Sequence, residues 1–130
     1  MKAMPVILAV DHNSRNLELL SQFLGREGYQ TRTAVDLQEF DQALAEADGI
    51  DLGLVDIAGF DRSIWERCEA LRHHKIPFLV LSPRQSTAIQ QASLTHGAHG
   101  VLVKPLTVKD LLGLICSLLK EATDGEEGNA

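Results

Sequence analysis

The chain has 130 residues, of which 45% are hydrophobic and 23% are charged, and its formal net charge at pH 7 is −6. This length and composition predict one soluble globular domain with a sizeable core. The acidic balance disfavours a broad basic face for nucleic acid, and no apolar run approaches the roughly 20 residues of a membrane span. We therefore expect neither direct nucleic-acid binding nor a membrane partner.

The two cysteines, Cys68 and Cys116, fall in segments that read as helices. Two buried or half-buried thiols without a disulfide framework are typical of a reducing compartment. Residues 1–5 carry one lysine and run into an apolar stretch that is too short for a signal-peptide core. We expect a cytoplasmic protein.

Five short runs along the chain are expected to be β-strands. Four of them are continuously apolar and suit fully buried strands, whereas the run at 29–35 alternates and is expected at a sheet edge. In chain order the runs are 6–10, 29–35, 52–55, 78–81 and 101–103.

A helical pattern follows each of these strands. Gly28 is suited to end the first helix, Asp36 with Glu39 resembles a capping arrangement at the start of the second, and Thr107 with Asp110 resembles one at the start of the fifth. The second helix is expected to run through Leu44. In the other four, the residues that share an apolar face are Leu17, Leu20 and Leu24; Ile64, Trp65, Cys68 and Leu71; Ile89, Ala92 and Thr95; and Leu111, Leu114, Ile115 and Leu118.

Strands that alternate with helices imply right-handed crossovers and a mainly parallel sheet covered on both faces. The pattern predicts an α/β, flavodoxin-like doubly wound (βα)5 fold, with a parallel five-stranded sheet in the order 2-1-3-4-5. We expect this domain to span residues 5–120. The tail at 121–130 is acidic and rich in glycine, and it is expected to be disordered.

Polar side chains stand where four of the predicted strands end. Asp11 and His12 follow the first strand, Asp56 the third, Ser82 the fourth and Lys104 the fifth. In an open parallel sheet, ligands bind beyond the carboxyl ends of the strands. Alone, each residue is better explained as a solvated loop residue or a helix cap. Together they favour phosphoryl transfer, which depends on positioning and on neutralising oxygen charge.

Each of these residue types has a role in that chemistry. A carboxylate such as Asp56 can act as the nucleophile that forms an acyl phosphate. Asp11 can help to hold Mg²⁺, which prefers hard oxygen ligands. Lys104 supplies a positive charge, and the hydroxyl of Ser82 can donate a hydrogen bond to a phosphoryl oxygen.

Five segments make the chain resemble a receiver domain of the response-regulator type. The resemblance covers about residues 5–120, and the segments are 7–11, 16–20, 51–57, 76–82 and 97–105. It implies that Asp56 is the phosphoacceptor, assisted by Ser82 and Lys104. It also implies that Asp11, Asp56 and the backbone carbonyl of Ala58 hold Mg²⁺.

The same resemblance implies a cis peptide bond between Lys104 and Pro105 and a sensor histidine kinase as the phosphoryl donor. It implies a downstream protein partner that binds the face formed by the last two helices and the last strand. No enzymatic activity is expected beyond the domain's own phosphorylation and dephosphorylation.

Two positions and one loop depart from the family pattern. The family usually has a second acid at the position of His12, and because imidazole is a poor Mg²⁺ ligand we expect weak magnesium binding. Protonated His12 could instead supply part of the missing charge, or the side chain could simply face solvent. An aromatic residue usually stands at the position of Val101, which we expect to be a core residue.

The loop at 58–61 lacks the Met-Pro pair that is common there in the family. The resemblance therefore predicts neither the shape of this loop nor the packing of Trp65. Trp65 is expected in the core rather than as a binding platform. The other histidines are expected at the surface; they are His73, His74, His96 and His99.

Two other functions remain as alternatives. His12 and Val101 favour a pseudo-receiver that binds a protein partner without phosphorylation, whereas the intact Asp56, Ser82 and Lys104 argue against it. A flavodoxin-like cofactor enzyme is disfavoured because the loop at 11–15 has no glycine-rich phosphate cradle and begins with an acid.

Overall fold

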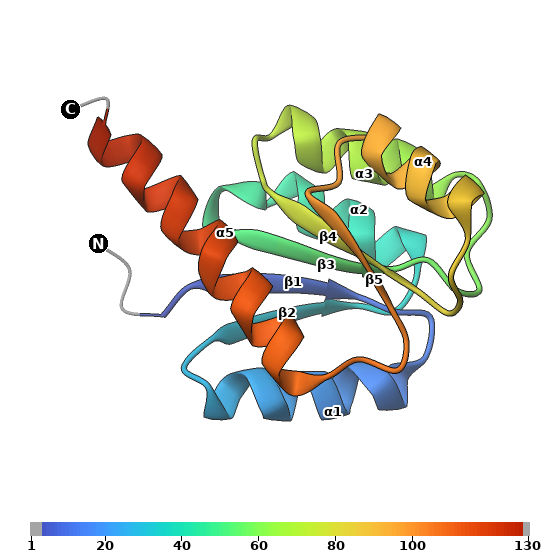
Figure 1. The fold of residues 1–130 in the computed structure, drawn as a ribbon, viewed down its shortest axis with the longest axis horizontal. Coiled ribbons are helices and arrows are strands. Elements are labelled where there is room, and N and C mark those ends of the chain that lie inside the picture. The colour runs from blue at the N-terminus through green and yellow to red at the C-terminus, as the bar shows by residue number, and fades with distance from the viewer. Residues whose placement is uncertain (1–3, 129–130) are drawn as a thin grey trace.

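The computed structural model describes residues 4–128. Each predicted strand is present, and its bounds differ from the prediction by no more than one residue at either end (Figure 1). The elements are β1 (Val6–Val10), α1 (Ser14–Arg26), β2 (Gln30–Ala34), α2 (Leu37–Ala45), the 3₁₀ turn η1 (Ala47–Gly49), β3 (Leu52–Asp56), α3 (Ile64–His73), β4 (Phe78–Ser82), α4 (Thr87–Thr95), β5 (Gly100–Val103) and α5 (Val108–Gly128).

The five strands form one parallel sheet in the order β2-β1-β3-β4-β5, which confirms the predicted fold. Val10 pairs with Val55, and Ser82 pairs with Val103. Because these residues stand at or near the ends of their strands, the carboxyl ends of all the strands meet at one edge of the sheet.

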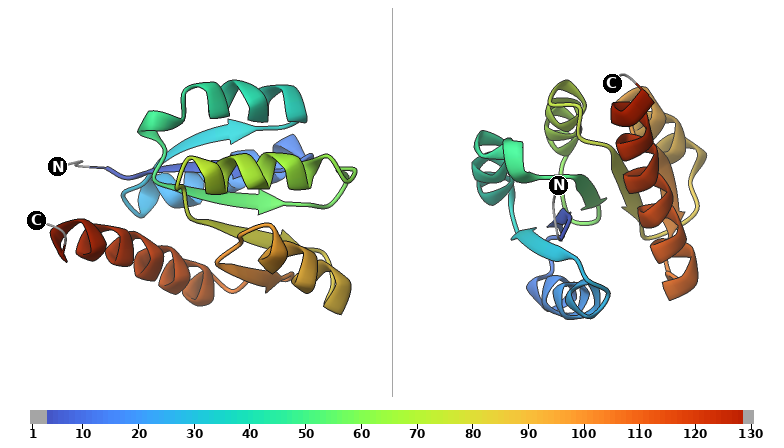
Figure 2. Two further views of the ribbon diagram at one scale, coloured as in Figure 1. Left: turned by 90° about the horizontal axis from the view of Figure 1, so that it is seen from above. Right: turned by 90° about the vertical axis from the view of Figure 1, so that its left-hand side faces the viewer.

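Helices cover both faces of the sheet, as Figure 2 shows. Side chains that alternate along each strand point to opposite faces, so each face has its own apolar cluster. One cluster joins Leu8, Val10, Val55, Phe78 and Val80 of the sheet to Phe40 of α2 and to Ile64, Cys68 and Leu71 of α3. The other joins Ile7, Leu52, Leu54 and Leu79 to Leu24 of α1 and to Leu111, Ile115 and Leu118 of α5.

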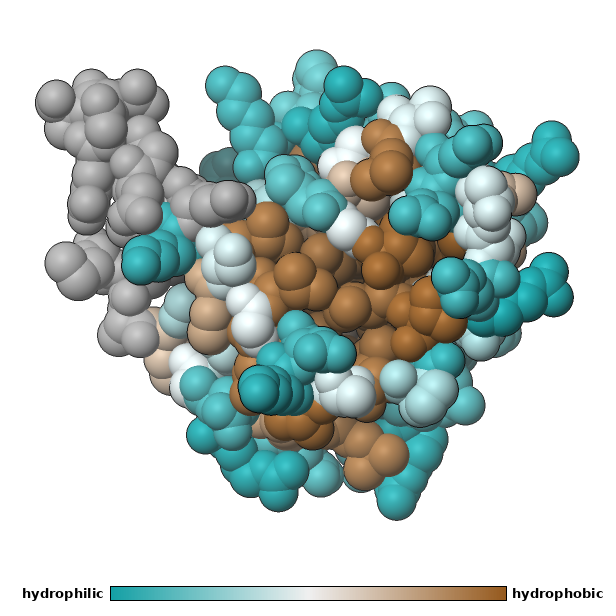
Figure 3. All heavy atoms as spheres, in the orientation of Figure 1, coloured by the Kyte–Doolittle hydropathy of each residue, from teal (hydrophilic) through white to brown (hydrophobic). Residues whose placement is uncertain are grey.

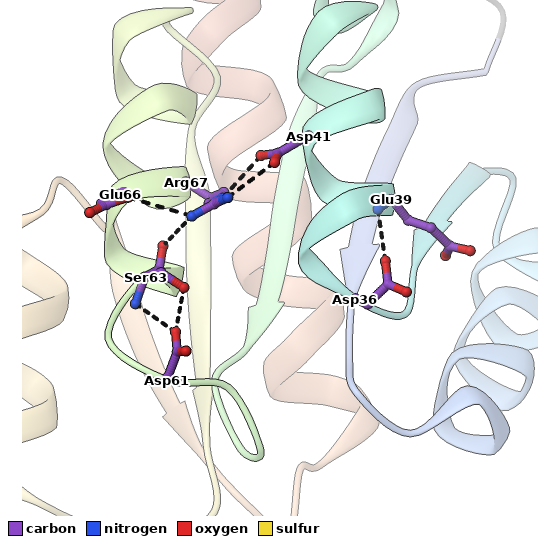
Figure 4. A network of polar contacts seen from close by, with 7 residues as sticks. All are labelled: Asp36, Glu39, Asp41, Asp61, Ser63, Glu66 and Arg67. Atoms are coloured by element: carbon purple, nitrogen blue, oxygen red, sulfur yellow. Dashed lines mark hydrogen bonds and ion pairs between the residues drawn. The ribbon is translucent and has the colours of Figure 1, made fainter.

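The predicted caps are present at both helix starts. Asp36 Oδ1 accepts a hydrogen bond from the Glu39 N–H at 2.8 Å, and Glu39 in turn accepts one from the Val35 N–H at 2.8 Å. At α5, Thr107 Oγ1 accepts from the Asp110 N–H at 3.3 Å. Figure 4 shows the first of these caps beside a second contact, in which the guanidinium of an α3 arginine binds both carboxylate oxygens of an α2 aspartate.

The prediction of a fully buried last strand is wrong. Val101 and Leu102 are half-buried, and Val103 is 39% exposed. The reason is that β5 is an edge strand with a neighbour on one side only, and it lies at the front of the sheet between α4 and α5 (Figure 1). The other edge is β2, as expected from its alternating pattern.

The structure also differs from the prediction at the end of the chain. α5 continues to Gly128, where the sequence predicts a disordered tail over 121–130; residues 129–130 lie outside the described residues. Extending an existing helix by one residue is much cheaper than nucleating one, and Glu, which occurs three times in residues 121–128, is a good helix former.

The thiols are not both buried. Cys68 is buried, and this burial raises its pKa to about 12, whereas Cys116 is exposed on α5. The Cys116 Sγ lies 3.3 Å from the hydroxyl of Tyr29, which links α5 to the loop before β2. Separately, none of the helices within residues 4–128 combines the length and the apolarity needed to cross a bilayer.

Candidate functional site

Backbone hydrogen bonds extend the pairing between neighbouring strands by one residue beyond the ends of three strands. The N–H of Asp11 donates to the carbonyl of Ala34 at 3.1 Å, and the N–H of Lys104 donates to the carbonyl of Ser82 at 2.9 Å. The N–H of Ile57 binds the carbonyl of the last leucine of β4 in the same way, at 3.2 Å. These bonds fix the backbone of the predicted site residues against the sheet edge.

Asp56 is the buried centre of this edge. Its side chain is 1% exposed and forms an ion pair through Oδ2 with the Nζ of Lys104, which is 32% exposed. Its other oxygen, Oδ1, accepts a hydrogen bond from the N–H of Ala58 at 3.0 Å. These contacts bring Asp56 and Lys104 together at the sheet edge, as the sequence predicts.

Asp11 is the second carboxylate at the site. Burial raises the pKa of Asp11 above its ordinary value, and the negative charge of Asp56 raises it further. A hydrogen bond from the Asn13 N–H at 2.8 Å, the charge of Lys104 and the side chain of Asn16 oppose this shift. Asp11 is thus close enough to Asp56 for the charge of Asp56 to raise the pKa of Asp11.

Ser82 stands at the same edge, but its hydroxyl is engaged elsewhere. The residue is 1% exposed, and its Oγ donates a hydrogen bond to the carbonyl of Arg84 at 2.6 Å. That bond directs the hydroxyl along the loop between β4 and α4. Ser82 must break it before it can reach a group bound to Asp56.

His12 lies against the loop that follows Asp56. Its ring meets that of Phe60 edge to face, with centroids 5.7 Å apart. Gly59, at the tip of the loop, has a φ of +84°, and a Cβ there would come within 3.2 Å of the His12 side chain. His12 therefore packs on this loop, although its side chain is exposed to solvent on its outer side.

The donor set at the site fits Mg²⁺. Asp11 and Asp56 supply carboxylate oxygens, and the carbonyl of Ala58 is a third candidate ligand of the same hard type. Among the described residues, no group of three or more His, Cys, Asp or Glu side chains could hold a metal ion.

A cavity of about 490 Å³ opens on Asp11, Asp56 and Lys104. Its remaining wall comes largely from apolar side chains of α1 and of the segment that starts α5, which the sequence pattern did not assign to the site. The sequence did contain one indication of this apolar wall, because Leu19 is a large apolar residue that lies outside the core-facing stripe of α1. The cis peptide bond between Lys104 and Pro105, also on this wall, confirms the prediction.

Two other predicted core residues are only half-buried. Val101 packs against the core and also lines a cavity of about 160 Å³ beside Ser82. Trp65 packs against the same core, and its outer face stacks on the ring of His96 with centroids 5.3 Å apart and planes at 14°. His96 is thereby half-buried, whereas His73, His74 and His99 are exposed as predicted.

Known proteins share this fold and sequence pattern. Residues 7–115 match the family model described as response regulator receiver domain. The transcriptional regulatory protein GltR of Pseudomonas aeruginosa is 32% identical over 120 residues, which are 89% of this chain and 49% of that protein. The response regulator MprA of Mycolicibacterium vanbaalenii is 33% identical over 123 residues, 92% of this chain and 53% of that protein. The chain thus spans about half the length of these relatives.

Solved structures give the same picture. A CheY-like receiver domain protein from Methanospirillum hungatei superposes with a TM-score of 0.84 at 27% identity, covering 94% of this chain and 98% of that one. The chemotaxis protein CheY4 of Vibrio cholerae superposes with a TM-score of 0.77 at 27% identity, covering 89% and 99%. With the parallel five-stranded sheet and the family match over residues 7–115, these likenesses show that the chain belongs to the response regulator receiver domain family.

Proposed function

We propose that Asp56 is the phosphoacceptor of this receiver domain and that it takes a phosphoryl group from a sensor histidine kinase in two-component signalling. The observation that carries this proposal is the buried carboxylate of Asp56, which is paired with Lys104 and opens on a cavity beside Asp11. A buried acid with a cation partner at the mouth of a cavity suits a nucleophile that must stay ionised.

The transfer forms a bond from an Asp56 oxygen to phosphorus and breaks the bond from phosphorus to a histidine nitrogen of the kinase. The ammonium of Lys104 offsets the negative charge that gathers on the phosphoryl oxygens. The Ala58 N–H, now bound to Asp56 Oδ1, keeps the carboxylate oriented. Loss of the phosphoryl group to water would return the domain to its resting state.

Mg²⁺ would be held by Asp11, Asp56 and the carbonyl of Ala58, and when bound it neutralises charge on the transferred group. His12 contributes no hard oxygen to this set. Its contact with Phe60 instead holds the loop on which Ala58 lies.

The output surface of this proposal is the α4-β5-α5 face, and the downstream partner is a protein. Its three elements expose Leu94 to 54%, Val103 to 39% and Leu114 to 36%. Neither α4 nor β5 contains a charged residue. Figure 3 shows a broad hydrophobic area on this side of the molecule, framed by hydrophilic side chains. The uncharged surfaces of α4 and β5 favour a protein over nucleic acid as the partner of this face.

We place this signalling in the cytoplasm, where the free thiols of Cys68 and Cys116 would stay reduced. The alternative is a pseudo-receiver, which the residues at the positions of His12 and Val101 favour. It predicts that the chain takes up no phosphate.

Intact-mass measurement after incubation with acetyl phosphate and Mg²⁺ separates the two functions. The wild type should gain one phosphate, and Asp56→Asn should gain none. Asp48→Asn removes an exposed carboxyl from η1 and serves as the matched control, which should label like the wild type. Equal labelling of Asp56→Asn would refute the assignment of the acceptor, and an unlabelled wild type would favour the pseudo-receiver.

A further inference from the structure

The cavity beside Asp56 combines charged groups with an extended apolar wall. The charged side chains come from the ends of β1, β3 and β5, whereas most of the apolar ones come from two helices on one face of the sheet and from the loop after β5. The apolar wall includes Leu19, Leu20 and Phe23 of α1, Leu106 of the loop after β5, and Val108 and Leu111 of α5. We call these six residues the apolar groove. The whole cavity, at about 490 Å³, has the size of a small-molecule site.

The apolar groove is open to water at its rim and closed at its base. Leu19 is 48% exposed and Val108 is 58% exposed, whereas Leu111 is only 4% exposed. Water contact with the two rim side chains is unfavourable, and a ligand with an apolar part would remove it. The rim side chains are therefore suited to contact the apolar part of a ligand.

The charged part of the cavity sets the other requirement for a ligand. The ammonium of Lys104 attracts a phosphoryl group, while Asp11 and Asp56 offer oxygens for a cation that would accompany it. A molecule that fills the whole cavity thus needs a phosphoryl group at one end and an apolar group at the other.

We infer that this receiver domain accepts phosphoryl groups from acyl phosphates that carry an apolar acyl group, in preference to those with a small one. The inference rests on the proposed function of Asp56. A carboxylate oxygen of Asp56 forms a bond to phosphorus, the bond from phosphorus to the acyl oxygen breaks, and the donor leaves as a carboxylate. One acyl phosphate is exchanged for another, so no proton, oxidant or further reactant is needed.

The test compares benzoyl phosphate with acetyl phosphate as donors to the wild-type chain at equal Mg²⁺. Initial rates of phosphate incorporation, measured by intact mass at low donor concentration, give a rate ratio for the two donors. We expect benzoyl phosphate to react about tenfold faster, because its ring buries several more carbon atoms than a methyl group does. The expected site of incorporation from both donors is Asp56.

The two donors also differ in intrinsic reactivity. This difference cancels when the rate ratio of a rim variant is compared with that of the wild type. Leu19→Asn and Val108→Asn should each lower the rate ratio several-fold, since both place a polar group where the ring would lie. Both residues are exposed, so neither change should prevent folding. Met4→Asn is the matched control; Met4 is 46% exposed, precedes β1 and does not line the cavity, so the ratio should equal that of the wild type.

The outcomes separate this inference from the proposed function. Labelling of the wild type at the same rate by both donors, or a ratio that the two rim variants leave unchanged, would overturn the inference and leave Asp56 as the acceptor. In that case the apolar groove would be a surface for a protein. If neither donor labels the wild type, both this inference and the proposed function of Asp56 would be overturned.

Discussion

The buried carboxylate of Asp56 has a partly exposed partner in the ammonium of Lys104. Removing the partner leaves a charge in a site where water cannot compensate for it. Lys104→Met should therefore lower the free energy of unfolding by about 2 kcal/mol, below the 3–5 kcal/mol of a fully buried pair because Lys104 is partly solvated. Urea denaturation would measure the change.

The same substitution made in Asp56→Asn should cost much less, because no charge is then left unpaired. Lys109→Met removes an exposed lysine at the start of α5 and controls for the change in net charge. A cost that is equal in both backgrounds would show that Lys104 stabilises the fold through its packing and not through Asp56.

A second prediction concerns His12 and magnesium. Replacing His12 by Asp adds a hard, charged ligand beside Asp11, and the added charge helps to offset the cost of dehydrating the ion. His12→Asp should bind Mg²⁺ about tenfold more tightly than the wild type, a factor that corresponds to about 1.4 kcal/mol for the added ligand. Titration followed by amide chemical shifts would measure both affinities. His12→Asn is the neutral control, and tighter binding by the wild type would assign His12 a role in holding the metal.

A third prediction uses the pH dependence of Asp11. Because the pKa of Asp11 is raised by burial and by Asp56, folding favours the protonated carboxyl, and the ionised form costs stability at neutral pH. Asp11→Asn keeps the acceptor for the Asn13 N–H and should raise the free energy of unfolding at pH 7. The gain should shrink as the pH falls through the raised pKa and vanish below the ordinary value of 3.8, where Asp11 is protonated in both states.

Urea denaturation of Asp11→Asn and the wild type at a series of pH values would test this dependence. Asp48→Asn, at an exposed site, corrects for removing one negative charge from a chain of net charge −6. A gain that grows as the pH falls would have the opposite sign and would contradict a pKa raised by burial.

The fold was predictable because its signals are local. The strand positions follow from short apolar runs, and the capping bond between Asp36 and the Glu39 N–H is encoded within four residues. The edge at which Asp56 and Lys104 meet was predictable as well, because parallel strands bring their carboxyl ends together. The exposure of Val103 was missed because its run is uniformly apolar, although the predicted strand order already places β5 at an edge of the sheet.

The details of the site depend on contacts between distant segments. The position of His12 depends on the left-handed turn at Gly59 and on Phe60, a contact that no sequence period encodes. The wall of the cavity depends on how α1 and α5 settle on one face of the sheet. The direction of the Ser82 hydroxyl depends on a loop carbonyl. Residue type predicted which groups meet, but not where each of them points.

The last prediction is about the response of Ser82 to phosphorylation. Its hydroxyl now donates to the carbonyl of Arg84, and a phosphoryl group on Asp56 offers a more negative acceptor. The hydroxyl should turn toward it and release the Arg84 carbonyl, which changes the loop at 83–86. Val101 is short and stiff about χ1, so it cannot carry the change across β5 as a rotating ring would.

Amide-shift mapping before and after addition of beryllofluoride, a mimic of the phosphoryl group, would follow this response. Shifts should be concentrated at 82–86, and the affinity for a downstream partner should change little, because a ligand moves an equilibrium only by its differential affinity for the two states. Ser82→Ala should lose the shifts in the loop while still binding beryllofluoride. Large shifts across α4, β5 and α5 in the wild type would show that another residue couples Asp56 to the α4-β5-α5 face, and that Val101 does not confine the change to the loop.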